Sequence, residues 1–230
     1  SDYVSRNLHH WIDLIFGYPL LSDSKWVHTV QQVIALGVQH LSCYAMTVVP
    51  RTALASFIRS KKVPPIDAAQ SAAQFEYLMQ ELRNAGYLHY EISNYCLPGQ
   101  RAIHNSNYWK GIPYLGIGPS AHSFDGESRQ WNVANNALYL RAVEKGEGLF
   151  EREQLTRVQK INETIMTSLR TIEGLPLSLV EPHLDTTGFR NWKGLVQDFA
   201  AKGLLNIESD VAVLTDQGKL LADAIAAELF

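Results

Sequence analysis

The chain has 230 residues, of which 46% are apolar and 19% are charged, a balance typical of globular rather than disordered proteins. The formal net charge is −3 without long runs of like charge, so electrostatics indicate neither a nucleic-acid partner nor a membrane partner. No apolar stretch reaches the length of a membrane span and no signal peptide opens the sequence, so we expect a cytoplasmic protein without membrane insertion.

The first predicted elements form a strand, a helix and a second strand. The apolar run Trp11–Phe16 predicts a strand that ends in a Gly-Tyr-Pro turn. Residues 22–24 (SDS) offer N-caps for the following helix, whose apolar residues recur at helical spacing from Trp26 until Gly37 ends it. Residues 39–47 predict the second strand. This length suits a right-handed crossover between parallel strands.

The same alternation then repeats once. Asp67 can cap a helix that Gly86 ends, and residues 87–93 predict a third strand. These are units of an α/β barrel or of a doubly wound sheet. Residues 95–132 interrupt the rhythm with Gly, Asn, Ser and aromatic residues, and Asp125-Gly126 predicts a hairpin turn.

The C-terminal part is predicted to be a separate helical unit. From about residue 151 the pattern is helical, and residues 204–207 and 211–214 predict a small two-stranded wing. Helices with a wing indicate a winged-helix-like module. We therefore expect two domains, residues 1–150 and residues 151–230.

A winged helix raises the question of DNA binding. From residue 160 to the end there are six Lys and Arg against ten Asp and Glu, a local balance of −4. Because DNA binding depends on basic groups that displace counterions, no nucleic-acid partner is expected, and the module is interpreted as structural or as a protein contact surface.

The chain has only two cysteines, Cys43 and Cys96, which are far apart and without C-x-x-C spacing. A secreted disulfide scaffold and a Cys-ligated zinc or iron–sulfur site are therefore not expected. Each cysteine is predicted to be a small buried apolar residue.

Two constellations could carry chemistry. In the first strand the alternation of side chains puts Asp13 and Ile15 on one face, towards a barrel lumen or ligand cleft, and the opposite face against helices. A carboxylate on a buried strand is costly unless it is paired or binds something, so a hydrogen-bonded core Asp and a ligand-binding Asp are both open interpretations.

The second constellation is the HNSNYW segment of residues 104–109, which joins an imidazole, two amides, a phenol and an indole. Imidazole can ligate haem iron, and aromatic rings can stack on a flat macrocycle. On composition alone, a packed and hydrogen-bonded polar loop is the simpler interpretation.

Several segments, taken in order, resemble one family, the C-terminal part of the radical S-adenosylmethionine haem chaperones, a group widely labelled oxygen-independent coproporphyrinogen III oxidase-like. The segments are residues 12–19 (IDLIFGYP), 40–44 (HLSCY), 90–95 (YEISNY), 104–109 (HNSNYW), 114–118 (YLGIG), 121–123 (AHS) and 214–218 (LTDQG). The resemblance covers nearly the whole chain. It implies an α/β fold, the C-terminal part of a partial (β/α) TIM-like barrel followed by a small helical, winged-helix-like domain.

The resemblance implies two cofactors for the full-length parent, S-adenosylmethionine and a 4Fe-4S cluster. The family positions that contact S-adenosylmethionine match Asp13 and Ile15, and also Ala45 on the next strand. The C-x-x-x-C-x-x-C loop that holds the cluster does not occur in this sequence. The chain is therefore expected to start partway through the barrel and to be inactive as an enzyme by itself.

The H-N-x-x-Y-W motif of the chaperones, which the decarboxylating oxidases typically lack, is intact as His104, Asn105, Tyr108 and Trp109. It implies a protein that binds haem and hands it to an apo-haemoprotein. His104 would be the iron ligand or a propionate partner, Asn105 would supply hydrogen bonds, and the two rings would frame the macrocycle.

Two other functions and one assembly remain as alternatives. The parent could be an oxygen-independent coproporphyrinogen III oxidase, which acts by radical oxidative decarboxylation in porphyrin biosynthesis, or the chain could be a non-catalytic protein-interaction module. A homodimer formed through the open edge of the first strand is a further hypothesis.

Overall fold

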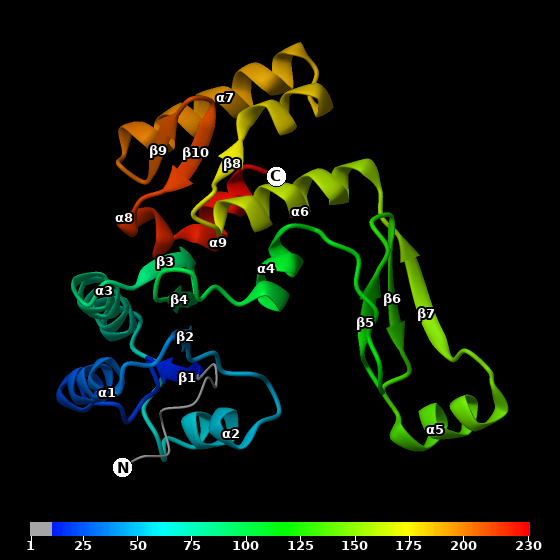
Figure 1. Cartoon of the computed structure of the whole chain (residues 1–230), viewed down its shortest axis with the longest axis horizontal. Coiled ribbons are helices and arrows are strands. Elements are labelled where there is room, and N and C mark those ends of the chain that lie inside the picture. Colours follow the sequence, from blue (N-terminus) through cyan, green and yellow to red (C-terminus); the bar gives the residue numbers. More distant parts are fainter. Residues whose placement is uncertain (1–10) are drawn as a thin grey trace.

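The computed structural model describes residues 11–230, which form a mixed α/β fold with three small sheets (Figure 1). The N-terminal elements are β1 Trp11–Phe16, α1 Asp23–Ala35, β2 His40–Ala45, α2 Ala53–Arg59, α3 Ala68–Asn84, β3 Leu88–Glu91, β4 Asn94–Cys96 and α4 Ile103–Trp109. The middle elements are β5 His122–Phe124, β6 Ser128–Asn132, α5 Asn136–Lys145 and β7 Phe150–Gln154. The C-terminal elements are α6 Arg157–Leu169, β8 Leu175–Pro176, α7 Thr186–Ala201, β9 Leu205–Glu208, β10 Val211–Leu214, α8 Asp216–Lys219 and α9 Ala222–Glu228.

The predicted helix starts are confirmed by their capping hydrogen bonds. The Ser22 side chain accepts a hydrogen bond from the Lys25 backbone N–H at the start of α1. At the start of α3, Asp67 Oδ1 accepts from the backbone N–H groups of Ala69 and Gln70, at 2.9 and 3.1 Å. These bonds satisfy backbone donors that have no partner inside the helix.

The first sheet has the strand order β1-β2-β4-β3. Strands β1 and β2 are parallel, as predicted. The third predicted strand, β3, does not join β2 directly, because the short strand β4 lies between them and pairs antiparallel with both. The irregular segment expected from residue 95 thus begins with a strand. The Glu91 carboxylate stabilises the tight turn between β3 and β4, because its Oε2 accepts hydrogen bonds from the Ser93 backbone N–H and from Asn94 Nδ2.

A polar side chain inside the first core fixes the turn after β1. Gln74 of α3 is only 2% exposed. Its Oε1 accepts from the Gly17 backbone N–H at 2.9 Å, and its Nε2 donates to Asp23 Oδ1 at 2.9 Å. Gly17 has φ +72°, a conformation that favours glycine, and a Cβ there would lie 2.5 Å from Ser71 Oγ.

Replacing Gln74 by Leu is expected to lower the free energy of unfolding by about 2–3 kcal/mol, because buried polar groups lose their partners. Urea unfolding followed by circular dichroism measures the change. The matched control is Gln80→Leu, at an exposed position of the same helix. Equal midpoints for the two variants would show that Gln74 does not hold the turn.

The middle sheet, β5-β6-β7, lies to one side of the molecule, with α5 at its far end (Figure 1). The predicted hairpin is confirmed, since β5 and β6 are antiparallel across Asp125 and Gly126. The predicted domain boundary after residue 150 falls inside this sheet, because all five residues of β7 pair with β6. The next helix, α6, begins after Thr156, which caps it reciprocally with Gln159.

The C-terminal part is built on a second core that α6, α7 and α9 form with the sheet β8-β10-β9. The two strands predicted at residues 204–207 and 211–214 are confirmed as the antiparallel pair β9 and β10. Half-buried Ile92, from the turn after β3, packs against both the first and the second core. Among residues 11–230, no helix is both long and apolar enough to cross a membrane.

Candidate functional site

The HNSNYW segment forms the helix α4, not the irregular loop that its composition suggested. His104 and Tyr108 are four residues apart and therefore lie on the same face of the helix. The distance between His104 Nε2 and Tyr108 Oη is 3.0 Å, and the two rings meet edge to face with centroids 5.0 Å apart. The helical period, rather than composition, brings these two side chains together.

Aromatic rings continue from α4 to the hairpin of the middle sheet. The rings of Tyr108 and Tyr114 lie 4.8 Å apart, and those of Tyr114 and Phe124 lie 6.2 Å apart. Tyr114 and Phe124 are also held by two backbone hydrogen bonds of 2.9 Å. The Arg129 guanidinium covers the Phe124 ring at 5.5 Å. We call His104, Tyr108, Tyr114 and Phe124 the aromatic row.

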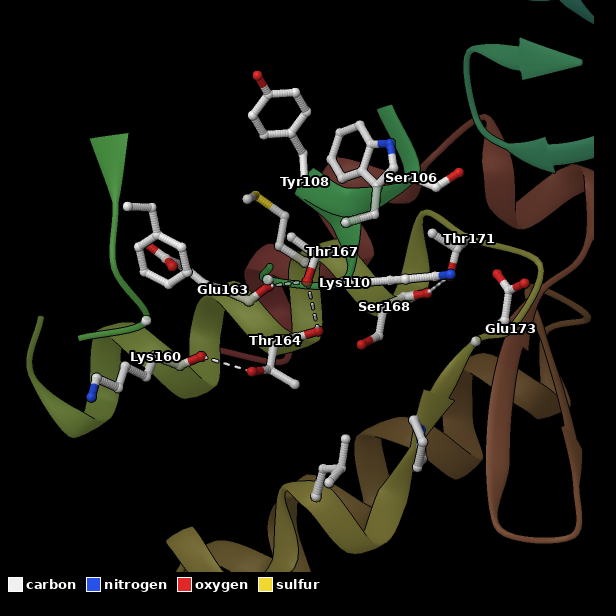
Figure 2. A pocket seen from close by; sticks show the side chains of 18 of the residues that line it. Ser106, Tyr108, Lys110, Lys160, Glu163, Thr164, Thr167, Ser168, Thr171 and Glu173 are labelled. Atoms are coloured by element: carbon white, nitrogen blue, oxygen red, sulfur yellow. Dashed lines mark hydrogen bonds between the residues drawn. The ribbon is translucent and has the colours of Figure 1, made fainter. Parts of the chain in front are cut away.

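A cavity of about 730 Å³ lies between α4, the β5–β6 hairpin, α6 and the segment of residues 171–179. We call it the α4–α6 cavity. Figure 2 shows the side chains from the α4 segment together with those of α6. The apolar and aromatic lining consists of Tyr90, Tyr108, Trp109, Tyr114, Phe124, Leu155, Met166, Pro176 and Leu179.

The four predicted haem residues divide between two places. Tyr108 and Trp109 line the α4–α6 cavity, whereas His104 and Asn105 belong to the same helix but do not line it. His104 touches the cavity only through Tyr108. The predicted iron ligand therefore lies behind Tyr108, outside the lining to which the two predicted rings belong.

Four basic side chains line the cavity, and three of them are paired. Arg101 donates to Glu173 at 2.5 Å, Arg129 to Glu163 at 3.0 Å, and Lys160 to Glu127. Lys110, the residue directly after α4, has no ion pair or side-chain hydrogen bond among residues 11–230.

The hydroxyl groups of the cavity donate their hydrogen bonds to backbone carbonyls. Thr164, Thr167 and Thr171 donate to the carbonyls of Lys160, Glu163 and Ser168, as the dashed lines in Figure 2 show. Ser106 likewise donates to the Ala102 carbonyl at 2.8 Å. These four hydroxyls therefore remain acceptors towards the cavity.

Arg170, at the end of α6, holds the Trp109 ring in place. Its guanidinium lies over that ring at 5.1 Å. The same group donates from Nε to Glu91 Oε1 at 3.0 Å and from an NH group to Asp223 at 3.1 Å. The Glu91 side chain is 0% exposed, so this ion pair is fixed inside the protein. Arg170 thereby joins α4, the first sheet and α9.

The residues predicted to contact S-adenosylmethionine do not all share one face of the first sheet. Asp13 and Ile15 lie on the same face of β1, and both are exposed. The interpretation of Asp13 as a hydrogen-bonded core residue is wrong, because its side chain reaches solvent. Ala45 is in register with Phe16 and therefore lies on the opposite face, where it lines a second cavity of about 590 Å³.

The Asp13 face of the sheet has polar atoms that fit a polar ligand. His40 Nδ1 and Asn94 Oδ1 are buried without a hydrogen-bond partner among the described residues. By register, His40, Ser42 and Asn94 share the face of Asp13. His40 Nε2 lies 2.7 Å from Tyr90 Oη, and burial lowers the pKa of His40, which favours its neutral form. S-adenosylmethionine, with its amino, carboxylate and ribose groups, matches these donors and acceptors in kind.

A 4Fe-4S cluster does not fit the residues of this chain. Cys43 and Cys96 are free and buried, and by register they point to opposite faces of the sheet. Burial raises the pKa of the Cys43 thiol, which opposes the thiolate form that metals require. Within residues 11–230, no three His, Cys, Asp or Glu side chains are grouped so as to hold a metal ion.

Several residues of the site have no strong signal in the sequence. Lys110 follows the motif directly, but Arg101, Arg129 and Arg170 come from three distant segments. A charged residue outside a motif is usually a solvated surface residue, so composition and spacing do not single these three out. Only the tertiary structure brings these segments together around one cavity.

The fold resembles that of a solved radical SAM enzyme. It matches the solved structure of coproporphyrinogen III oxidase (HemN) from Escherichia coli with a TM-score of 0.73, over 94% of this chain and 54% of that chain, at 22% sequence identity. The HemN C-terminal domain family matches residues 155–221.

Sequence similarity to known proteins identifies one family within this class. The chain is 34% identical over 222 residues to the heme chaperone HemW of Mycobacterium tuberculosis, covering 96% of this chain and 55% of that protein. It is 32% identical to HemW of Haemophilus influenzae, over 95% of this chain and 56% of that protein. The chain belongs to the HemW heme chaperone and HemN-like radical SAM family, and it spans about half the length of the curated relatives it matches.

Proposed function

We propose that this chain is the haem-binding part of a haem chaperone, which binds haem against α4 and hands it to an apo-haemoprotein. The observation that carries the proposal is the α4–α6 cavity, because Tyr108 and Trp109 of the HNSNYW helix form part of its aromatic wall. Aromatic faces suit a flat macrocycle, and a pocket of this size suits a cofactor.

The relatives support this proposal. Several proteins that are similar over nearly the whole chain are named heme chaperones, and the H-N-x-x-Y-W motif is intact. In the longer parent we expect S-adenosylmethionine on the Asp13 and Ile15 face of the first sheet, with the 4Fe-4S cluster held by residues outside this chain. The role that we assign to His104 is to position Tyr108 at the cavity wall.

The architecture of the parent is part of the same proposal. The parallel pair β1 and β2, with α1 and α3 packed against it, would form part of a TIM-like barrel. The C-terminal helices and the β9–β10 wing would form a winged-helix-like domain. We retain two domains, and we place the junction between β7 and α6, since β7 belongs to the middle sheet.

A haem titration followed by absorption spectroscopy tests the proposal. We expect a saturable shift of the Soret band, and His104→Ala is expected to weaken binding about tenfold, because Tyr108 loses its hydrogen-bond partner. The matched control is His28→Ala, at an exposed position of α1. A chain that is folded by circular dichroism and shows no saturable shift would refute haem binding by this chain.

A further inference from the structure

The residues that line the α4–α6 cavity suit the ring faces and the side groups of a macrocycle better than they suit its metal ion. Among the described residues that line the cavity there is neither histidine nor cysteine. His104, on the same helix, directs its Nε2 to Tyr108 Oη. Apolar atoms make up the larger part of the lining surface, and such a surface binds ring faces whether or not they carry iron.

One positive charge in the cavity has no ion-pair partner among residues 11–230, so the cavity can accept one anionic group. Arg101, Arg129 and Lys160 each have a glutamate partner, so their charges are balanced inside the protein. Lys110 lines the cavity as well, and its ammonium has no such partner within residues 11–230. A carboxylate of the ligand would balance this charge.

Four hydroxyl donors near the cavity are already in use. The hydroxyls of Ser106, Thr164, Thr167 and Thr171 each donate to a backbone carbonyl of the protein. A carboxylate only accepts hydrogen bonds, so these hydroxyls cannot serve it without breaking an existing bond. Lys110 can donate three hydrogen bonds, and its charge has no ion-pair partner among residues 11–230, so it suits an incoming carboxylate.

We propose that the α4–α6 cavity recognises a planar tetrapyrrole through its ring faces and through one propionate carboxylate, which pairs with Lys110, so that binding does not require iron. This inference rests on the proposed function, since it specifies how the same cavity recognises its ligand. The cavity volume of about 730 Å³ lies within the range of cofactor sites. Lys110 thus becomes a specificity residue for carboxylated porphyrins.

Fluorescence titration with two iron-free probes tests the inference. The first is deuteroporphyrin, which has two propionates, and the second is its bis-amide, in which both carboxylates are replaced by neutral groups. We expect the chain to bind deuteroporphyrin saturably and Lys110→Met to weaken this binding about tenfold, the effect of losing one charge-assisted hydrogen bond. Lys110→Arg should restore most of the affinity, and the bis-amide should bind the chain and Lys110→Met equally weakly.

The control variant is Lys25→Met, at an exposed position of α1 outside both cavities. It is expected to bind both probes as the unchanged chain does. Equal affinity of Lys110→Met and the unchanged chain for deuteroporphyrin would overturn the inference, and so would equal affinity of the chain for the acid and the bis-amide. Binding of haem without binding of deuteroporphyrin would overturn the inference alone, whereas binding of neither would refute the proposed function as well.

Discussion

Replacing Arg170 by Met is expected to lower the free energy of unfolding by about 3–5 kcal/mol, the cost of leaving a buried charge without its partner. The Glu91 side chain is 0% exposed, and Arg170 is the only ion-pair partner it has among the described residues. Methionine retains much of the side-chain volume, so the loss would come from the charge rather than from a cavity. Urea unfolding, followed by circular dichroism, measures it.

A double-mutant cycle assigns this effect to the ion pair. Glu91→Gln combined with Arg170→Met removes both charges, and the double variant should be more stable than Arg170→Met alone. The second ion pair of Arg170, with Asp223, is expected to add little, because the Asp223 side chain is 89% exposed. Arg190→Met, at an exposed position of α7, is the control. A loss as small as that of the control would show that the pair does not hold the two parts of the chain together.

The same substitution should change the environment of Trp109. Because Arg170 covers the Trp109 ring, its removal frees a ring that forms part of the cavity wall. A protein whose α4 is loosened would bind a macrocycle less well even in conditions where it stays folded. The ion pair with Glu91 thus connects the stability of the fold to the shape of the proposed haem site.

The second large effect is expected for Gly218→Ala, which should destabilise the fold by about 3 kcal/mol or more. Gly218 is buried in α8, where a Cβ would lie 2.0 Å from the Leu204 carbonyl oxygen. That oxygen belongs to the backbone and accepts a hydrogen bond from the Thr215 N–H, so it cannot move without loosening the start of β9. Differential scanning calorimetry measures the shift in Tm.

The control for Gly218→Ala is a glycine at which the same substitution should stabilise the fold rather than destabilise it. Gly194 lies inside α7, and a Cβ there would meet nothing within 4 Å. Alanine is favoured over glycine in a helix by about 1 kcal/mol, so Gly194→Ala is expected to raise the Tm. If both variants shifted the Tm in the same direction, the close approach of α8 to residue 204 would not be what requires glycine.

Local signals in the sequence predicted most of the elements. Asp67 caps the helix that it was expected to cap, Ser22 is the cap among the three candidates at residues 22–24, and the run Trp11–Phe16 is a strand over its whole length. Residues 125–126 form the predicted hairpin turn. These features depend on side chains and backbone groups a few residues apart, so the local sequence is sufficient to define them.

Two local predictions failed where a short element lacked a periodic pattern. The strand β4 has three residues, and the helix α4 has seven. The former is defined by pairing with β2 and β3, and its turn is closed by Glu91. Helices shorter than about 12 residues are marginal by themselves, so α4 depends on contacts such as that of Trp109 with Arg170.

The sequence alone contained the family motifs and predicted the order of most elements. It also singled out the rings of Tyr108 and Trp109, which line the cavity in the structure. Only the tertiary structure decided that His104 lies outside the cavity, that Ala45 and Asp13 lie on opposite faces of the sheet, and that Lys110 has no ion-pair partner among residues 11–230. The physical reason is that capping and periodicity act between near neighbours in the chain. A cavity and its balance of charge depend instead on segments as distant as α4 and α6, which meet only when the chain packs.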